Sequence, residues 1–137
     1  MSLVYVDASA AVKLVRDEPE SAALRAYLDG AELVASELVL AEVPRAIRRA
    51  SAADPTLRLD TLIARADAVV GAMGLVPLER HLLLAAGALA EPALRALDAI
   101  HVAAAVWVSP IDAFLTYDER QAAVARLAGL RTMAPGA

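Results

Sequence analysis

Four acidic residues lie in apolar surroundings at widely separated points of the chain: Asp7, Glu42, Asp98 and Asp118. A buried carboxylate is unfavourable unless a cation or a hydrogen-bond donor compensates its charge. A fold that gathered the four would therefore create a cation site. The chain has no Cys and only two His, so the ligands would be oxygens, which favour Mg²⁺ or Mn²⁺ over Zn²⁺.

Two of these acids follow predicted strands. Asp7 directly follows the apolar run Leu3–Val6, and Asp118 follows a second short apolar run at residues 113–116. Open α/β sheets build their ligand sites just beyond the carboxyl ends of such strands. Helix capping is the alternative for both acids, because Asp is a good N-cap. For Asp118 the pattern also fits a capping box, in which Gln121 reaches back to the cap residue.

Asp98 lies on a strongly apolar helix predicted for residues 95–108. Its carboxylate needs a cation, a donor or a cap position. His101 follows three residues later and is open to three interpretations: a partner of Asp98, a metal ligand, or a core histidine with one hydrogen bond. A single His on an apolar helix is most often the last of these.

Glu42 is predicted to face the core, because it shares a helix face with apolar residues such as Val39. An ion pair with Arg45 is the simpler alternative. Glu37 lies only a turn earlier, and periodicity alone does not choose between the two glutamates.

Strand and helix patterns alternate along the chain, which is typical of a parallel α/β sheet with helices on both faces. We expect Pro19 in a first helical turn, Ser36 as an N-cap, a kink or a restarted turn at Pro44, and another helix that opens at Asp54-Pro55. Pro77 places its strand at a sheet edge. The length suits a single domain, residues 1–137. Further strands are expected at 33–35, 75–78 and 130–133, and further helices at 9–15, 19–28, 36–49, 55–70, 82–89 and 119–127.

The composition, 59% hydrophobic and 22% charged, is that of a soluble globular protein. No apolar run approaches the roughly 18 residues of a membrane span, and no secretory signal is visible, so we expect a cytoplasmic protein that does not enter a membrane. The net charge of −4 argues against a general nucleic-acid coat. A nuclease remains allowed, because bound divalent ions invert the charge of an acidic site.

Five segments, in this order and spacing, resemble the PIN-domain ribonucleases and in particular the VapC-type toxins: VYVDASA, SELVLAEV, LRALDAIHVAAA, FLTYDERQ and LAGLRTMAP. The resemblance covers nearly the whole chain. It implies a three-layer α/β/α fold with an open parallel sheet of four to five strands. It also selects Glu42 over Glu37.

The same resemblance assigns the site. It implies catalytic and metal-binding roles for Asp7, Glu42, Asp98 and Asp118, a supporting hydroxyl at Thr116, and a small hydroxyl residue at Ser9.

The implied activity is an Mg²⁺- or Mn²⁺-dependent endoribonuclease in which water activated by the metal attacks the phosphodiester. The expected substrates are structured RNAs such as tRNA or rRNA. The expected partners are a second copy of the chain and a cognate antitoxin, whose tail would cover the acids. Arginines close to the acids in sequence are candidates for phosphate contacts: Arg45, Arg48, Arg49 and Arg120.

Two other functions remain open from sequence. One is a non-catalytic RNA- or protein-binding module on the same fold. The other is a receiver or phosphatase domain with a phosphoryl-accepting Asp, which fits poorly because the only lysine, Lys13, lies in the first predicted helix.

Overall fold

The computed structural model of the protein describes residues 2–137. All strand pairs in the sheet are parallel, and the strand order is β3-β2-β1-β4-β5. The strands are β1 (Leu3–Val6), β2 (Glu32–Ser36), β3 (Gly74–Val76), β4 (Ala113–Leu115) and β5 (Thr132–Met133). The helices are α1 (Ala8–Val15), α2 (Ser21–Leu28), α3 (Val39–Ala53), α4 (Leu59–Gly71), α5 (Arg80–Gly87), α6 (Ala96–Trp107) and α7 (Glu119–Leu127).

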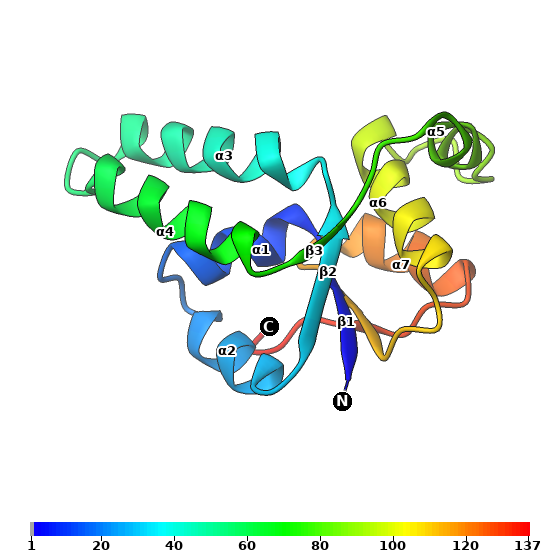
Figure 1. Ribbon diagram of the computed structural model, residues 1–137, viewed down its shortest axis with the longest axis horizontal. Coiled ribbons are helices and arrows are strands. Elements are labelled where there is room, and N and C mark those ends of the chain that lie inside the picture. Colours follow the sequence, from blue (N-terminus) through cyan, green and yellow to red (C-terminus); the bar gives the residue numbers. More distant parts are fainter. Residues whose placement is uncertain (1) are drawn as a thin grey trace.

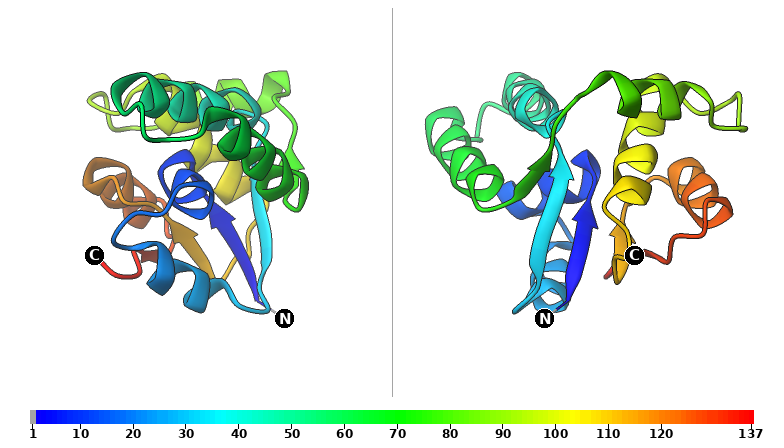
Figure 2. Two further views of the ribbon diagram at one scale, coloured as in Figure 1. Left: turned by 90° about the vertical axis from the view of Figure 1, so that its left-hand side faces the viewer. Right: turned by 45° about the vertical axis from the view of Figure 1, so that its right-hand side comes forward.

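Helices cover both faces of the sheet (Figure 1). Alternate residues of a strand point to opposite faces, and β1 divides its side chains accordingly. Val4 and Val6 pack in a core with α1, α2, α3 and α4, whereas Tyr5 packs in a second core with α5, α6 and α7. The views in Figure 2 show the corresponding helices on opposite sides of the sheet. The predicted three-layer α/β/α arrangement with a parallel sheet is confirmed.

The centre of the sheet is formed by β1, which pairs with β2 on one side and β4 on the other. The chain passes from β1 to β2 and β3, and later returns to the opposite side of β1 to form β4. Such a reversal of strand order opens a crevice at the carboxyl ends of the two strands. Asp7 and Thr116, which directly follow β1 and β4, lie at this point. The edge position predicted for the strand before Pro77 is also correct.

Three predicted helix starts are wrong, and each has a local reason. Pro19 lies outside α2, whose N-cap is Glu20. Ser36 ends β2 and accepts a hydrogen bond from the Leu38 N–H before α3 begins. Asp54 holds a turn instead of opening a helix, because its carboxylate accepts from the backbone N–H and hydroxyl of Thr56.

Pro44 lies within α3, which continues from Val39 to Ala53. The predicted restart of the helix at this proline is therefore not found. The proline removes the hydrogen bond to the Leu40 carbonyl. Leu40 is 55% exposed, so solvent can satisfy that carbonyl.

Among residues 2–137, no helix is both long and apolar enough to cross a bilayer. This agrees with the sequence, in which no apolar run approaches the roughly 18 residues of a membrane span.

Candidate active site

All four predicted acids lie at the amino-terminal ends of helices. Asp7 is the N-cap of α1 and Asp118 is the N-cap of α7, while Glu42 and Asp98 lie in the first turns of α3 and α6. A helix amino terminus carries partial positive charge, which stabilises a nearby carboxylate. The fold therefore provides each acid with a favourable electrostatic position, and capping and a functional site are not exclusive alternatives here.

Asp7 is the most enclosed of the four, with 4% of its surface exposed. Its Oδ1 accepts hydrogen bonds from the Ser9 hydroxyl at 2.7 Å and the Ala10 N–H at 2.9 Å. Its Oδ2 lies 2.7 Å from the Thr116 hydroxyl. Burial raises the pKa of Asp7 above its ordinary value, although these hydrogen bonds and His101 oppose the shift. Ser9, which the resemblance marks as a small hydroxyl after the first acid, and Thr116, which it marks as a supporting hydroxyl before the last acid, thus both contact Asp7.

Thr116 links Asp7 to Gln121, whose Oε1 lies 2.8 Å from the threonine hydroxyl. Gln121 is buried and its amide also reaches the Asp98 carbonyl, at 3.4 Å. The capping-box prediction is therefore wrong for Gln121: the Asp118 N–H donates to Thr116 instead. Gln121 connects the Asp7 side of the site to the start of α6. The sequence did not indicate this contact, because Gln121 fits the pattern of a capping box.

The Thr116 hydroxyl has one proton but two oxygen neighbours that accept. Two arrangements satisfy it. A protonated Asp7 donates to Thr116, which donates to Gln121, or Thr116 donates to an ionised Asp7 while the Gln121 amide turns its NH₂ toward the hydroxyl. The second arrangement gives up the bond from Gln121 to the Asp98 carbonyl. The raised pKa of Asp7 brings the first arrangement closer to neutral pH.

Glu42 is held by His101, whose Nε2 lies 2.7 Å from Oε1 of Glu42. The other ring nitrogen, Nδ1, lies 2.8 Å from the Tyr5 hydroxyl. Burial, reinforced by the negative charges of Asp7 and Glu42, raises the pKa of Tyr5 well above its ordinary value, so its hydroxyl keeps its proton. A neutral His101 that accepts from Tyr5 at Nδ1 must carry its proton on Nε2 and donate it to Glu42.

His101 is therefore a core histidine with two hydrogen bonds. The proposed pairing with Asp98 is wrong, and both ring nitrogens are already bonded, which leaves neither for a metal. Tyr5 was not recognised from sequence. Its position between Val4 and Val6 does place it on the opposite face of the sheet, but nothing local reveals that this face contains His101.

Tyr5→Phe should lower cleavage of RNA by about 10-fold, the lower end of the range for losing a partner of a metal ligand, because Tyr5 acts on Glu42 only through His101. The reason is that His101 would lose the bond that fixes its tautomer. The rate constants of the single variant, Glu42→Ala and the double variant measure this. Tyr5→Phe should add no further loss to Glu42→Ala, whereas additive losses would contradict the connection. Tyr27→Phe is the matched control.

Asp98 and Asp118 are close enough to influence each other. Burial raises the pKa of Asp98, and the charges of Asp118 and Glu42 raise it further, against opposing contributions from His101 and Arg95. Asp118 uses Oδ1 to accept from the Arg120 and Gln121 N–H groups.

Several carboxylate oxygens remain available for a cation. They are Oδ2 of Asp118, Oε2 of Glu42 and both oxygens of Asp98, which take part in no hydrogen bond among the described residues. Within residues 2–137, however, no three acidic or histidine side chains approach closely enough to hold one ion directly. Mg²⁺ commonly keeps several waters and uses only one or two carboxylates. The donor set therefore fits a hydrated Mg²⁺ or Mn²⁺ ion.

The remaining sequence alternatives are resolved by specific contacts. Glu37 accepts a hydrogen bond from the Leu78 N–H at 2.8 Å and so ties the segment after β3 to the start of α3. Glu42 forms its ion-pair contact with His101, and Arg45 has none among the described residues. Glu42 is therefore the glutamate that belongs with the other acids.

Two hollows adjoin the acids. Glu42, Arg45, Arg49 and Leu97 line the larger one, of about 470 Å³, together with Ala8, Ser9, Val12, Ala41 and Ala46. A smaller hollow, of about 190 Å³, is lined by Asp98, Asp118, Arg95 and Arg120, together with Ala93 and Leu94. Arginine side chains thus flank the acids in both hollows.

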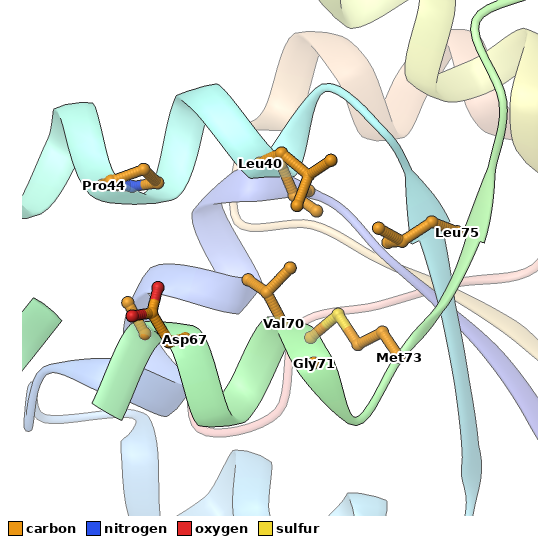
Figure 3. Close-up of a pocket in the computed structure, with 9 residues that line it drawn as sticks. Leu40, Pro44, Asp67, Val70, Gly71, Met73 and Leu75 are labelled. Carbon is orange, nitrogen blue, oxygen red and sulfur yellow. The ribbon is translucent and has the colours of Figure 1, made fainter. Parts of the chain in front are cut away.

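A third hollow, of about 260 Å³, lies between α3 and α4 and is lined by residues such as Leu40, Pro44, Val70 and Met73 (Figure 3). None of the four site acids lines it. Among the described residues that line it, Asp67 on α4 is the only acidic one. It is therefore separate from the carboxylate site.

The sheet order, the two helical layers and the acids at the helix amino termini define a PIN-type fold. Residues 4–127 match the PIN domain family, so the chain belongs to that family. Full-length relatives place it among the VapC-type members. Ribonuclease VapC35 of Mycobacterium tuberculosis (strain CDC 1551 / Oshkosh) is 37% identical over 140 residues, covering 98% of each chain.

Further relatives support this placement. Ribonuclease VapC47 of the same strain is 33% identical over 141 residues, covering 98% of each chain. Ribonuclease VapC46 of M. tuberculosis strain ATCC 25618 / H37Rv is 36% identical over 139 residues, with 98% and 99% covered. The crystal structure of VapBC2 from Rickettsia felis bound to a DNA fragment from their promoter contains a chain of the same fold, with a TM-score of 0.71, 11% identity, and coverage of 97% and 98%.

Proposed function

We propose that this protein is a toxin of the VapC type: an endoribonuclease that requires Mg²⁺ or Mn²⁺ and is neutralised by a cognate antitoxin. The observation that carries the proposal is the position of Asp7, Glu42, Asp98 and Asp118 at the amino termini of four helices, with unbonded oxygens left on three of them. Full-length relatives that bear the name ribonuclease VapC support the activity.

The chain's own residues would prepare the site in three ways. Ser9 and Thr116 orient Asp7, and His101 orients Glu42. Asp98 and Asp118 would hold the cation through their free oxygens. Arg95 and Arg120, which line the same hollow as these two acids, would attract the phosphate of the substrate. A bound divalent cation would supply a water of lowered pKa and offset the charge that develops on the phosphate.

Metal removal tests the proposal. EDTA should stop the cleavage of RNA, and an excess of Mg²⁺ or Mn²⁺ should restore it, because a bound cation lowers the pKa of its water and offsets the charge of the phosphate, which the carboxylates cannot do. Denaturing gels of purified protein with total RNA measure this. Retention of RNA without cleavage, with and without metal, would instead favour the non-catalytic binding module.

An antitoxin partner is supported by the VapBC2 complex, whose chain shares this fold. A basic segment of such a partner would pair with the carboxylates, since a guanidinium group binds two carboxylate oxygens at once. We further propose tRNA or rRNA as the substrate class and the cytoplasm, which contains both, as the site of action.

A homodimer is also proposed. Besides Leu97 at the larger hollow, four large apolar side chains on α5 and α6 are 44–68% exposed, and an exposed apolar patch often marks an interaction surface. They are Leu83, Leu84, Val106 and Trp107. Light scattering of the purified protein would distinguish a dimer from a monomer.

A further inference from the structure

We propose that the larger hollow beside Glu42 is a nucleotide-binding subsite, which takes an unpaired nucleotide of the RNA next to the phosphate that is cleaved. The proposal rests on the function proposed above and adds the form of RNA that the site accepts. The hollow is defined by Glu42, Arg45, Ala46, Arg49 and Leu97, and has a volume of about 470 Å³. Small-molecule sites typically occupy about 300–1,000 Å³.

The position of the hollow connects it to the acids. Glu42 lines it directly, and so does Ser9, whose hydroxyl donates to Asp7. Leu97 lies on its wall, and the next residue, Asp98, lines the smaller hollow with Asp118. A phosphate at the acids would therefore leave its neighbouring nucleotide at the mouth of the larger hollow.

The charges along α3 suit an RNA strand. Glu42, Arg45 and Arg49 are spaced i, i+3 and i+7 and so lie along one face of the helix. At a rise of 1.5 Å per residue, the two arginines stand about 4.5 and 10.5 Å beyond Glu42 along the helix axis. Among the described residues neither arginine forms an ion pair, whereas Lys13, Arg25 and Arg58 do.

The lining between the arginines and the acids is apolar. Ala8, Val12, Ala41 and Ala46 contribute to it, and Leu97, which is 50% exposed, adds a larger aliphatic surface. A nucleobase could rest on this surface while a guanidinium group stacks on its face and contacts a phosphate. The smaller hollow, with its two acids and two arginines, suits a phosphate instead.

The chemistry favours RNA over a protein tail. Arg45 and Arg49 would repel a basic segment of the kind expected to pair with the acids, but they would attract phosphates. A paired nucleotide keeps its base inside a duplex, so only an unpaired one can enter the hollow. The protein should therefore bind an RNA loop more tightly than a duplex.

The test measures RNA binding in EDTA, so that it does not depend on cleavage. The probes are a fluorescein-labelled RNA hairpin with a single-stranded loop and a fully paired duplex of the same stem. Fluorescence anisotropy measures the binding of each probe at several salt concentrations. Replacing both Arg45 and Arg49 by Gln should weaken hairpin binding by at least about tenfold. It should also reduce the slope of the logarithm of the binding constant against the logarithm of the salt concentration by about 1.4, since each lost phosphate contact removes about 0.7. The matched control replaces Arg80 and Arg131 by Gln, two exposed arginines that line neither hollow, and it should change neither quantity.

A second variant tests the hollow itself. Ala46→Phe should fill it and weaken hairpin binding about tenfold while leaving duplex binding unchanged, a shift of about 1.4 kcal/mol. Ala53→Phe, at the exposed end of α3, is the control. Unchanged hairpin binding by Ala46→Phe, or an equal loss when Arg80 and Arg131 are replaced by Gln, would overturn the proposal. A loss of affinity for the cognate antitoxin without loss of RNA binding would identify a protein-docking surface and also overturn it.

These outcomes are separable from the proposed function. If EDTA fails to stop cleavage, the metal requirement fails whatever the anisotropy shows. If EDTA stops cleavage but the Ala46→Phe and arginine variants bind the hairpin as the wild type does, only the subsite is wrong.

Discussion

Asp7→Asn should abolish RNA cleavage, with a rate reduced by at least about 10³-fold. The substitution removes one negative charge from the acidic group, where a cation would contribute several kcal/mol of transition-state stabilisation, and each 1.36 kcal/mol corresponds to about tenfold in rate. The effect should be specific to charge. Asn keeps the side-chain oxygen that accepts from Ser9 and the Ala10 N–H, and Thr116 can accept from its amide while it donates to Gln121.

Because these contacts survive, the variant should fold and should be more stable than the wild type. In EDTA at pH 7 its melting temperature should be higher than that of the wild type. The sign follows from the raised pKa of Asp7: the folded protein binds this proton more tightly than the unfolded chain does, so ionised Asp7 destabilises the fold as pH rises. The difference in melting temperature should shrink toward pH 4 or so, about the ordinary pKa of Asp.

Cleavage by purified wild type and Asp7→Asn, with melting curves of both, measures the two effects together. Asp67→Asn is the control, because it neutralises an exposed carboxylate that lines the separate hollow between α3 and α4. Full activity in Asp7→Asn would remove Asp7 from the metal site. Lost activity together with a lowered melting temperature would mean that the substitution acts by damaging the fold.

Asp98→Asn should have the second largest effect: it should lower the affinity of the protein for the divalent cation. Asp98 accepts no hydrogen bond on its carboxylate among the described residues, and its pKa is raised by burial and by the charges of Asp118 and Glu42. A unit charge about 4 Å from another contributes about 4 kcal/mol at an effective dielectric constant of about 20. Allowing for solvent around this partly exposed group, we expect Mn²⁺ affinity to fall about 100-fold.

The shift of the melting temperature with Mn²⁺ measures this without any RNA. At a concentration of about 100 times the wild-type Kd, Mn²⁺ should stabilise the wild type by about 2.7 kcal/mol, but Asp98→Asn by only about 0.4 kcal/mol. Asp67→Asn should respond as the wild type does. An unchanged response in Asp98→Asn would show that the cation is held without Asp98.

Much of the fold could be predicted from the sequence, because its signals are local. The apolar run before Asp7 predicts the central strand, and the helix at residues 119–127 has the predicted bounds. The predicted starts of helices near prolines were less accurate. A residue such as Pro19 or Asp54 is compatible with a turn as well as with a first helical turn, and only the packed structure distinguishes them.

The identities of the acids could also be predicted, but not the contacts that hold them. Thr116 reaches Asp7 across 109 positions, and His101 reaches Glu42 across 59. Such partners depend on how strands and helices align in three dimensions, which periodicity does not encode. His101 illustrates this: its nearest acid in sequence is Asp98, whereas its bonded acid comes from α3.

The central claim is that carboxylates and a divalent cation activate water for the attack on RNA. The alternative is attack by the 2′-hydroxyl of the RNA itself, which ribonucleases promote with positioned acid and base groups such as histidines. Neither histidine of the chain is placed to act as such an acid or base. Both ring nitrogens of His101 are bonded, and His81 is an exposed residue of α5 that lies 3.3 Å from Glu79 and lines neither hollow beside the acids.

A single 2′-deoxy substitution distinguishes the two routes most directly. The cleavage site is first mapped on an RNA substrate, and the nucleotide on the 5′ side of the cleaved bond is then replaced by its 2′-deoxy form. With water as the nucleophile, the substituted RNA should still be cleaved at that bond in the presence of Mg²⁺ or Mn²⁺, and the products should carry no 2′,3′-cyclic phosphate. Complete protection of the substituted bond, with a cyclic phosphate on the products of unsubstituted RNA, would contradict the account.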